Sequence, residues 1–353
     1  MKKSLIALAV MAAAGAASAQ SSVTLFGIVD AAVEWGRGNL SDKTSLVNSG
    51  YNASRLGFRG TEDLGGGMSA SFWLEAGLQN DNGSGFGTNA NNQGTNALGG
   101  GGLTFNRRST VSLAGGWGEL RLGRDYTPQF WNMTVFDPFG TNGVGTTAVY
   151  FQNGTGGASF TGITGIRASN SIGYFLPGNL GGFYGQAMYF MGENPSGSAT
   201  EDDGSGAGVR LGFATGPFNV ALAPSKTEYA AGDVKQANLG GEWNFGLGKV
   251  QAQYAKDKVG SVDAKGWLIG GLFPVGAGEI RASYSTYQVD VAGDPETKKV
   301  AIGYVHNLSK RTAVYTTYAR LKNDGGNAAG LGGATVRPNS SSSGLDIGVR
   351  HSF

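Results

Sequence analysis

Arginines alternate with apolar residues in the segment "SRLGFRG" at residues 54–60. Leu56 and Phe58 stand among Arg55, Gly57 and Arg59. In a β-strand successive side chains point to opposite faces, so both guanidinium groups would lie on one face and both apolar groups on the other. A row of fixed cations beside water sorts ions by the sign of their charge. These arginines could therefore act on ions through their charge, provided that the face that carries them meets water.

Catalytic chemistry has little support in the sequence. The chain has no cysteine, and its two histidines are His306 and His351. Covalent catalysis needs a nucleophile and a base within reach of each other, and neither a G-x-S-x-G segment nor a Walker-type phosphate loop is present. Two histidines also make a zinc cluster unfavourable. We expect no enzyme activity, no cofactor and no metal site.

The first nineteen residues, "MKKSLIALAVMAAAGAASA", are typical of a secretory signal peptide. Lys2 and Lys3 precede an uncharged apolar run, and Ala17-Ser18-Ala19 fits a cleavage site. The run is shorter than the ~20 residues that a spanning helix needs. Without these two lysines the 27 basic residues become 25, equal to the 25 acidic ones. The remaining residues 20–353, which we predict to be a single domain, therefore carry no net charge that would attract nucleic acid.

Residues after Gln20 alternate between apolar and polar side chains with a period of two. The alternation is clear at 23–35, 68–79 and 234–246, and it predicts strands with one apolar and one polar face. Sixteen strands are predicted, near 22–35, 51–61, 67–79, 104–114, 118–125, 168–176, 182–191, 206–215, 218–229, 234–246, 249–257, 264–274, 279–290, 298–308, 311–322 and 343–353.

The connections between these strands alternate in length. Short ones such as Gly216-Pro217 alternate with longer polar ones such as 80–103 and 126–167. An even number of antiparallel strands, with tight turns at one rim and loops at the other, is the plan of an outer-membrane barrel. Hydrocarbon offers no hydrogen-bond partner, so such a sheet must close and leave no edge. The predicted fold class is all-β, a transmembrane antiparallel β-barrel with sixteen strands.

Several segments resemble one family, the trimeric general-diffusion porins of Gram-negative β-proteobacteria, which includes the neisserial porins. The segments are "SSVTLFGIVDAAVEW" (21–35), "SRLGFRGTEDLGGGMSASFWLEAG" (54–77), "STVSLAGGWGELRLGRDYTP" (109–128), "GYVHNLSKRTAVYTTYAR" (303–320) and "GLDIGVRHSF" (344–353). The resemblance implies a homotrimer in the outer membrane, in contact with its lipid and lipopolysaccharide, that passes ions and small hydrophilic solutes.

The resemblance also assigns roles to one loop and to the last residue. The third extracellular loop, 126–167, would fold into the lumen and narrow it, and no periodicity within the loop predicts regular structure there. Phe353 would be the signal read by the barrel-assembly machinery. Its phase agrees with outward Leu345, Ile347 and Val349.

In a membrane barrel, one face of each arginine-bearing strand meets lipid and the other meets water. An arginine facing lipid near the midplane costs ~2–4 kcal/mol, so the cations must face the lumen and the apolar residues between them must face lipid. The resemblance adds a basic wall near the third loop. The predicted constriction residues are Arg55, Arg59, Arg108, Arg121, Arg124, Arg167, Asp137 and Glu75.

Two of these positions need a further assumption. Alternation from Leu120 and Leu122 would turn Arg124 outward, so we expect a bulge or strand end at Gly123. Asp137 is expected to face the arginines across the gap from the loop. With several arginines and one obvious loop carboxylate, the sequence favours weak anion preference. Two alternatives remain, a channel dedicated to one solute class and a structural or adhesive barrel without an open pore.

Overall fold

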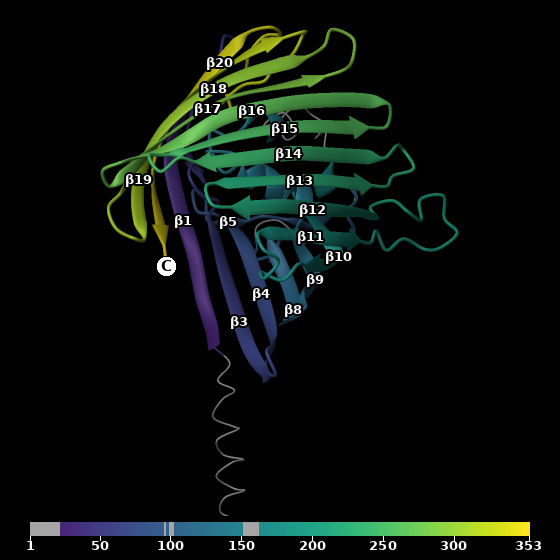
Figure 1. Ribbon diagram of the computed structural model, residues 1–353. Coiled ribbons are helices and arrows are strands. Elements are labelled where there is room, and N and C mark those ends of the chain that lie inside the picture. Colours follow the sequence, from purple (N-terminus) through teal and green to yellow (C-terminus); the bar gives the residue numbers. More distant parts are fainter. Residues whose placement is uncertain (1–21, 95–96, 99–101, 151–161) are drawn as a thin grey trace, which may run out of the picture.

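The structure is a computed structural model that describes residues 22–94, 97–98, 102–150 and 162–353 (Figure 1). The predicted signal peptide at 1–19 lies outside the described residues. The strands from the amino-terminal half are β1 (Ser22–Arg37), β2 (Lys43–Asn48), β3 (Arg55–Gly65), β4 (Met68–Gln79), β5 (Ser84–Gly85), β6 (Thr88–Asn89), β7 (Ala97–Leu98), β8 (Arg108–Gly115), β9 (Gly118–Tyr126) and β10 (Arg167–Phe175).

The remaining strands follow one another with no helix between them. They are β11 (Phe183–Phe190), β12 (Gly206–Thr215), β13 (Phe218–Thr227), β14 (Val234–Asn244), β15 (Lys249–Val259), β16 (Val262–Val275), β17 (Gly278–Val289), β18 (Glu296–Asn307), β19 (Thr312–Asp324) and β20 (Ser341–Ser352). The helix α2 (Pro128–Val135) and the 3₁₀ turn η1 (Ile163–Gly165) both lie between β9 and β10. None of the helices formed by the described residues is long and apolar enough to cross a membrane.

The long strands close into a barrel. Each pairs antiparallel with its sequence neighbours, and β1 completes the ring by pairing with β3 through Ser22–Ile28 and with β20 through Ile28–Arg37. The described residues form an eighteen-stranded sheet, and sixteen strands make the wall because β2 and β5 only add short pairings to β1 and β4. The predicted sixteen-stranded antiparallel barrel is confirmed.

Burial alternates along the wall strands as the sequence predicts. In β14 and β15 the side chains of Gln236, Asn238 and Gln253 are buried, whereas Leu239 and Tyr254 between them are about half exposed. Large apolar side chains therefore cover the outside of the barrel and polar ones line its inside. This is the reverse of a protein in water, and it suits a wall between lipid and an aqueous lumen.

Two features of the structure differ from the sequence prediction. First, β3 starts at Arg55, not at residue 51, because the carboxylate of Asp30 accepts the backbone N–H groups of Tyr51 (3.0 Å) and Asn52 (2.6 Å) and holds them in a turn. Second, the loop at 126–167 contains α2, although no periodicity predicted a helix. Pro128 opens this helix, where a missing backbone N–H costs nothing.

Candidate functional site

The first half of the β9–β10 loop lies against the polar inner face of the barrel. The Asn132 side chain in α2 donates to the backbone oxygen of Ala221 in β13 (3.0 Å) and to Asn238 Oδ1 in β14 (2.7 Å). At the end of α2, Gln253 Nε2 in β15 donates to the backbone oxygen of Met133 (3.2 Å). Each contact uses an inward-facing polar group that would otherwise need water. The helix is thus bonded to three neighbouring wall strands.

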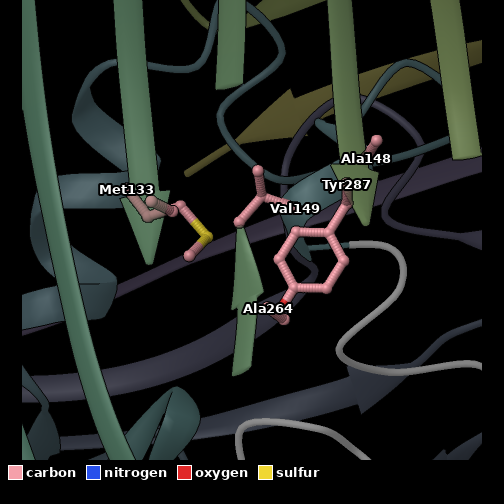
Figure 2. Packing of buried hydrophobic residues seen from close by; sticks show 6 residues of the cluster. Met133, Ala148, Val149, Ala264 and Tyr287 are labelled. Atoms are coloured by element: carbon pink, nitrogen blue, oxygen red, sulfur yellow. The ribbon is translucent and has the colours of Figure 1, made fainter. Parts of the chain in front are cut away.

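The second half of the loop continues along the same wall. Lys299 Nζ in β18 donates to the backbone oxygen of Thr146 (2.7 Å), and Ser285 Oγ in β17 accepts the Ala148 N–H (2.9 Å). Figure 2 shows Met133 and Val149 beside Tyr287 and Ala264, which form one buried apolar cluster with Ala148 and Ala255. Val144 N–H also donates to Asp346 Oδ2 in β20 (3.4 Å), so the described part of the loop follows the inner wall from β12 to β20. The loop residues 151–161 lie outside the described part.

Glycines on the inner wall leave room for this loop. The ring of Phe136, which is fully buried, occupies the space where a Cβ of Gly240 would stand, and Pro138 lies 2.7 Å from the corresponding point at Gly270. Glycine is the residue that lets a second segment approach a strand this closely. Part of the high glycine content is therefore explained by loop packing.

A cavity of about 560 Å³ lies between α2 and the opposite part of the wall. Trp131 of α2 contributes to its lining, and the wall strands together with the residue before β8 contribute five arginines and two carboxylates. These charged residues are Arg55, Arg107, Arg108, Arg121, Arg210, Glu75 and Asp125. The lining thus carries three more positive than negative charges.

Glu75 joins two of the arginines. Arg107 Nε donates to Glu75 Oε1 at 2.6 Å, and Arg55 Nη1 lies 3.5 Å from the same oxygen. Trp73 Nε1 donates to the other carboxylate oxygen at 3.1 Å. Glu75 stands directly opposite Gly57 in β3 and Arg108 in β8. Glu75 therefore lies on the same face of the sheet as Arg108 and as Arg55, which is two residues before Gly57. This single carboxylate orients the arginines at the β3–β4–β8 corner.

Asp125 organises two further cavity arginines, Arg108 and Arg121. Arg121 Nη1 lies 2.5 Å from Asp125 Oδ2, and Arg108 Nε lies 3.7 Å from the same oxygen. Arg121 also pairs with Glu119 at 2.9 Å. The guanidinium groups stack on aromatic rings, Arg108 on Trp73 and Arg121 on Phe175. Stacking fixes a guanidinium plane without neutralising its charge.

Two predicted arginines, Arg167 and Arg59, lie near the cavity without lining it. Arg167 donates from Nη2 to the hydroxyl of Tyr126 (3.0 Å), behind the lining residues. Arg59 faces the lumen but is exposed, with its guanidinium over the rings of Phe26 and Trp73. Both lie on the basic wall, but the cavity lining does not include them.

Arg124 departs from the prediction. The expected bulge at Gly123 is not present, because β8 and β9 pair regularly through Ser109 and Arg124. The register shift in this region lies in the neighbouring strand β10, between Ala168 and Ser171. The guanidinium donates to the backbone oxygen of Asn106 (2.6 Å) and to Ser169 Oγ (2.8 Å). Arg124 therefore ties two connecting segments together and does not line the cavity.

Asp137 also departs from the expected geometry. Its carboxylate accepts backbone N–H groups of its own loop, from Phe139 (3.0 Å), Thr141 (3.1 Å) and Thr147 (3.0 Å), and it is only 4% exposed. Burial raises the pKa of Asp137 above its ordinary value, against these bonds and the charge of Lys299. The structure places it inside the loop, and the carboxylates that line the cavity beside the arginines are Glu75 and Asp125.

Sequence reasoning missed Arg107, Arg210 and Tyr126. Arg107 directly precedes β8, where alternation no longer fixes direction, and it turns inward to Glu75. Arg210 lies in the alternating stretch "VRLGF" and donates from Nε to Asn132 Oδ1 (2.9 Å), so strand parity alone could have found it. The Tyr126 hydroxyl accepts from both Arg107 and Arg167, and nothing in the sequence marks this.

Comparison with known proteins agrees with the fold. The sequence profile of the Gram-negative porins matches residues 5–326. Outer membrane porin protein 32 of Delftia acidovorans is 39% identical over the full length of both chains, and major outer membrane protein P.IB of Neisseria meningitidis serogroup B is 37% identical over 130 residues, 35% of this chain and 34% of that one. The solved structure of an anion-selective porin from Comamonas acidovorans superposes with a TM-score of 0.81 at 36% identity, covering 95% of this chain and 100% of that one.

The chain belongs to the Gram-negative porin family. It is an outer-membrane porin, which forms a water-filled channel for passive diffusion of ions and small hydrophilic solutes and is not an enzyme. The alternative of a structural or adhesive barrel without a pore is thereby set aside.

Proposed function

We propose that the arginine-lined cavity is the selective constriction of the channel and that it favours anions. The observation that carries this proposal is the excess of three positive charges in the lining, held by Glu75 and Asp125 in fixed orientation. A lining of one predominant sign selects ions by charge. The loop supports the proposal because α2 occupies the lumen side of β12–β14 and confines the water-filled path to the arginine side.

The similar porin from Comamonas acidovorans is described as anion-selective, which agrees with this proposal. Glu75 and Asp125 each neutralise part of the charge of two arginines, so we expect a moderate preference and not exclusion of cations.

Reversal potential in a salt gradient tests the proposal directly. With purified protein in a planar bilayer and a tenfold KCl gradient, we expect a reversal potential whose sign shows that chloride is more permeable than potassium. Lower ionic strength should strengthen the preference because the Debye length grows from about 10 Å at 0.1 M to about 30 Å at 0.01 M. A potential at zero, or of the sign set by potassium, would contradict anion preference.

We further propose that the chain matures by loss of residues 1–19 and assembles as a homotrimer, with Phe353 as the signal for the barrel-assembly machinery. The backbone of Phe353 exchanges two hydrogen bonds of 3.1 Å with Gly27 in β1, and its ring lies over Gly27 on the outside of the barrel. The ring is 42% exposed, so a partner can contact it while the strands remain paired.

A replacement at Phe353 separates recognition from stability. We expect Phe353→Ala to reduce the amount of folded barrel in the outer membrane of cells severalfold, while Phe353→Trp retains it. Refolding of urea-denatured Phe353→Ala into lipid vesicles should proceed almost as for the parent, because truncating a half-exposed ring removes little buried area. Equal loss in cells and in vesicles would show a packing role instead.

A further inference from the structure

Arg210 has no carboxylate partner within the described residues, unlike the other four arginines of the cavity lining. Its guanidinium donates to two neutral oxygens, Asn132 Oδ1 (2.9 Å from Nε) and the Tyr184 hydroxyl (3.3 Å from Nη2). The residue is nevertheless only 6% exposed. Buried charges are as a rule paired with an opposite charge. An anion in the cavity can supply the opposite charge that Arg210 lacks.

Aromatic side chains lie beside Arg210 on the same part of the wall. Phe175 in β10 stands opposite Gln186 in β11, and Gln186 stands opposite Arg210 in β12. Strand register therefore sets these three side chains in one row, and all of them line the cavity. Tyr184 lies two residues before Gln186 on the same face, and the Arg210 guanidinium is 4.9 Å from the centre of its ring. The row thus joins an unpaired cation to two aromatic rings.

Glycines let these rings lie against the wall. Gly212 stands opposite Tyr184, and the tyrosine ring occupies the space where a Cβ of Gly212 would stand. A Cβ at Gly173 would lie 3.3 Å from the ring of Phe175. A side chain at either glycine would push the ring away from the wall. This part of the inner wall is therefore an aromatic surface, in contrast to the polar side chains that face inward from β14 and β15.

Trp131 adds an exposed indole from the loop side of the cavity. The helix α2 buries Phe130, Asn132 and Met133, whereas Trp131 lines the cavity and is 40% exposed. Asn132, the next residue, accepts from Arg210, so Trp131 lies close to this cation along α2. A solute that covers the indole removes apolar area from water, which is favourable. The cavity volume of about 560 Å³ also lies within the range of about 300–1,000 Å³ found for small-molecule sites.

We propose that the Arg210 part of the cavity binds aromatic carboxylates. The carboxylate pairs with Arg210 in a charge-assisted hydrogen bond, and the ring stacks on the indole of Trp131. An aliphatic carboxylate of the same charge makes the first contact but not the second. The channel therefore distinguishes organic anions by their aromatic character as well as by their charge. This inference names a solute class for the proposed constriction, so it rests on the proposed function.

Block of the chloride current through single channels tests the inference in the parent protein. The probes are benzoate and cyclohexanecarboxylate, which have the same number of carbon atoms and are both ionised at neutral pH. We expect benzoate to halve the current at a concentration about 2- to 12-fold lower than cyclohexanecarboxylate does, the factor that corresponds to one aromatic pair. Equal half-blocking concentrations, or stronger block by cyclohexanecarboxylate, would overturn the inference.

The reversal potential of the parent in KCl alone separates this result from the fate of the proposed function. A channel that prefers chloride but responds equally to the two acids contradicts only the aromatic site. A channel that prefers potassium contradicts the anion preference and the aromatic site together.

Three variants locate the site. Trp131→Leu keeps an apolar side chain but removes the aromatic face, so benzoate should lose its advantage over cyclohexanecarboxylate. Trp243→Leu is the matched control, because Trp243 is 50% exposed on the outward face of β14 and does not line the cavity, and it should be blocked as the parent is. Arg210→Gln should weaken block by both acids about fivefold, since both carry the carboxylate.

Open channels alone are recorded, so only folded protein contributes to these measurements. A benzoate advantage that persists in Trp131→Leu would overturn the inference, as would an equal loss in Trp243→Leu. Unchanged block of Arg210→Gln by both acids would show that the carboxylate binds elsewhere, which also contradicts the assigned site.

Discussion

Replacement of Gly240 by valine is expected to narrow the channel. The ring of Phe136 fills the position of a Cβ at Gly240, so a valine side chain and this ring cannot occupy their present places together. The strand cannot move, because β14 is hydrogen-bonded along its whole length to β13 and β15. The loop therefore moves, at a cost of about 1–3 kcal/mol for overpacking. Phe136 moves away from β14, which pushes α2 toward the arginine cavity that it lines on one side.

Single-channel conductance in planar bilayers measures this effect. We expect Gly240→Val to show lower and noisier conductance than the parent, because the displaced loop enters the water-filled path beside the arginines. Gly241→Val is the matched control, because the next glycine faces outward and its nearest neighbour to an added Cβ is Asn219 O at 3.7 Å. Parent-like conductance in Gly240→Val, or an equal fall in Gly241→Val, would show that the loop does not restrict the pore.

The membrane explains why the wall of this barrel could be predicted from the sequence. Strands between lipid and water must alternate with a period of two, so Leu56 and Phe58 fixed the direction of Arg55 without knowledge of any contact. The same parity correctly placed Arg108 and Arg121 on the inner face. Wherever a side chain lies inside a regular strand, its face follows from its position in the sequence.

The loop and the strand ends could not be predicted in the same way. Asp137 was expected opposite the arginines because it is the obvious loop carboxylate, but its three backbone bonds depend on how residues 137–147 fold. Arg107 lies one residue before β8 and turns inward without any periodic signal. Arg124 bends toward Asn106 and Ser169 at the irregular start of β10. Each outcome is set by tertiary contacts that alternation does not encode.

Removal of three cavity arginines is expected to abolish the anion preference. The triple variant Arg55→Gln/Arg108→Gln/Arg121→Gln leaves two arginines against two carboxylates in the lining, so its net charge becomes zero. Arg107 retains its 2.6 Å contact with Glu75, which keeps the β4–β8 corner bonded. One unit charge about 4 Å from an ion in water contributes about 1 kcal/mol, roughly fivefold in permeability ratio. The reversal potential in a KCl gradient should therefore move to zero or change sign.

Two further variants show whether the lining charge itself is the cause. Glu75→Gln removes a negative charge from the same cavity, so it should shift the reversal potential in the opposite direction, toward stronger anion preference. Arg320→Gln removes an exposed arginine whose neighbours Ala319 and Leu321 are buried, so it faces outward and should leave the potential unchanged. If Glu75→Gln and the triple variant moved the potential in the same direction, a change in pore shape would explain both. Opposite shifts can come only from the sign of the charge that the permeating ion meets.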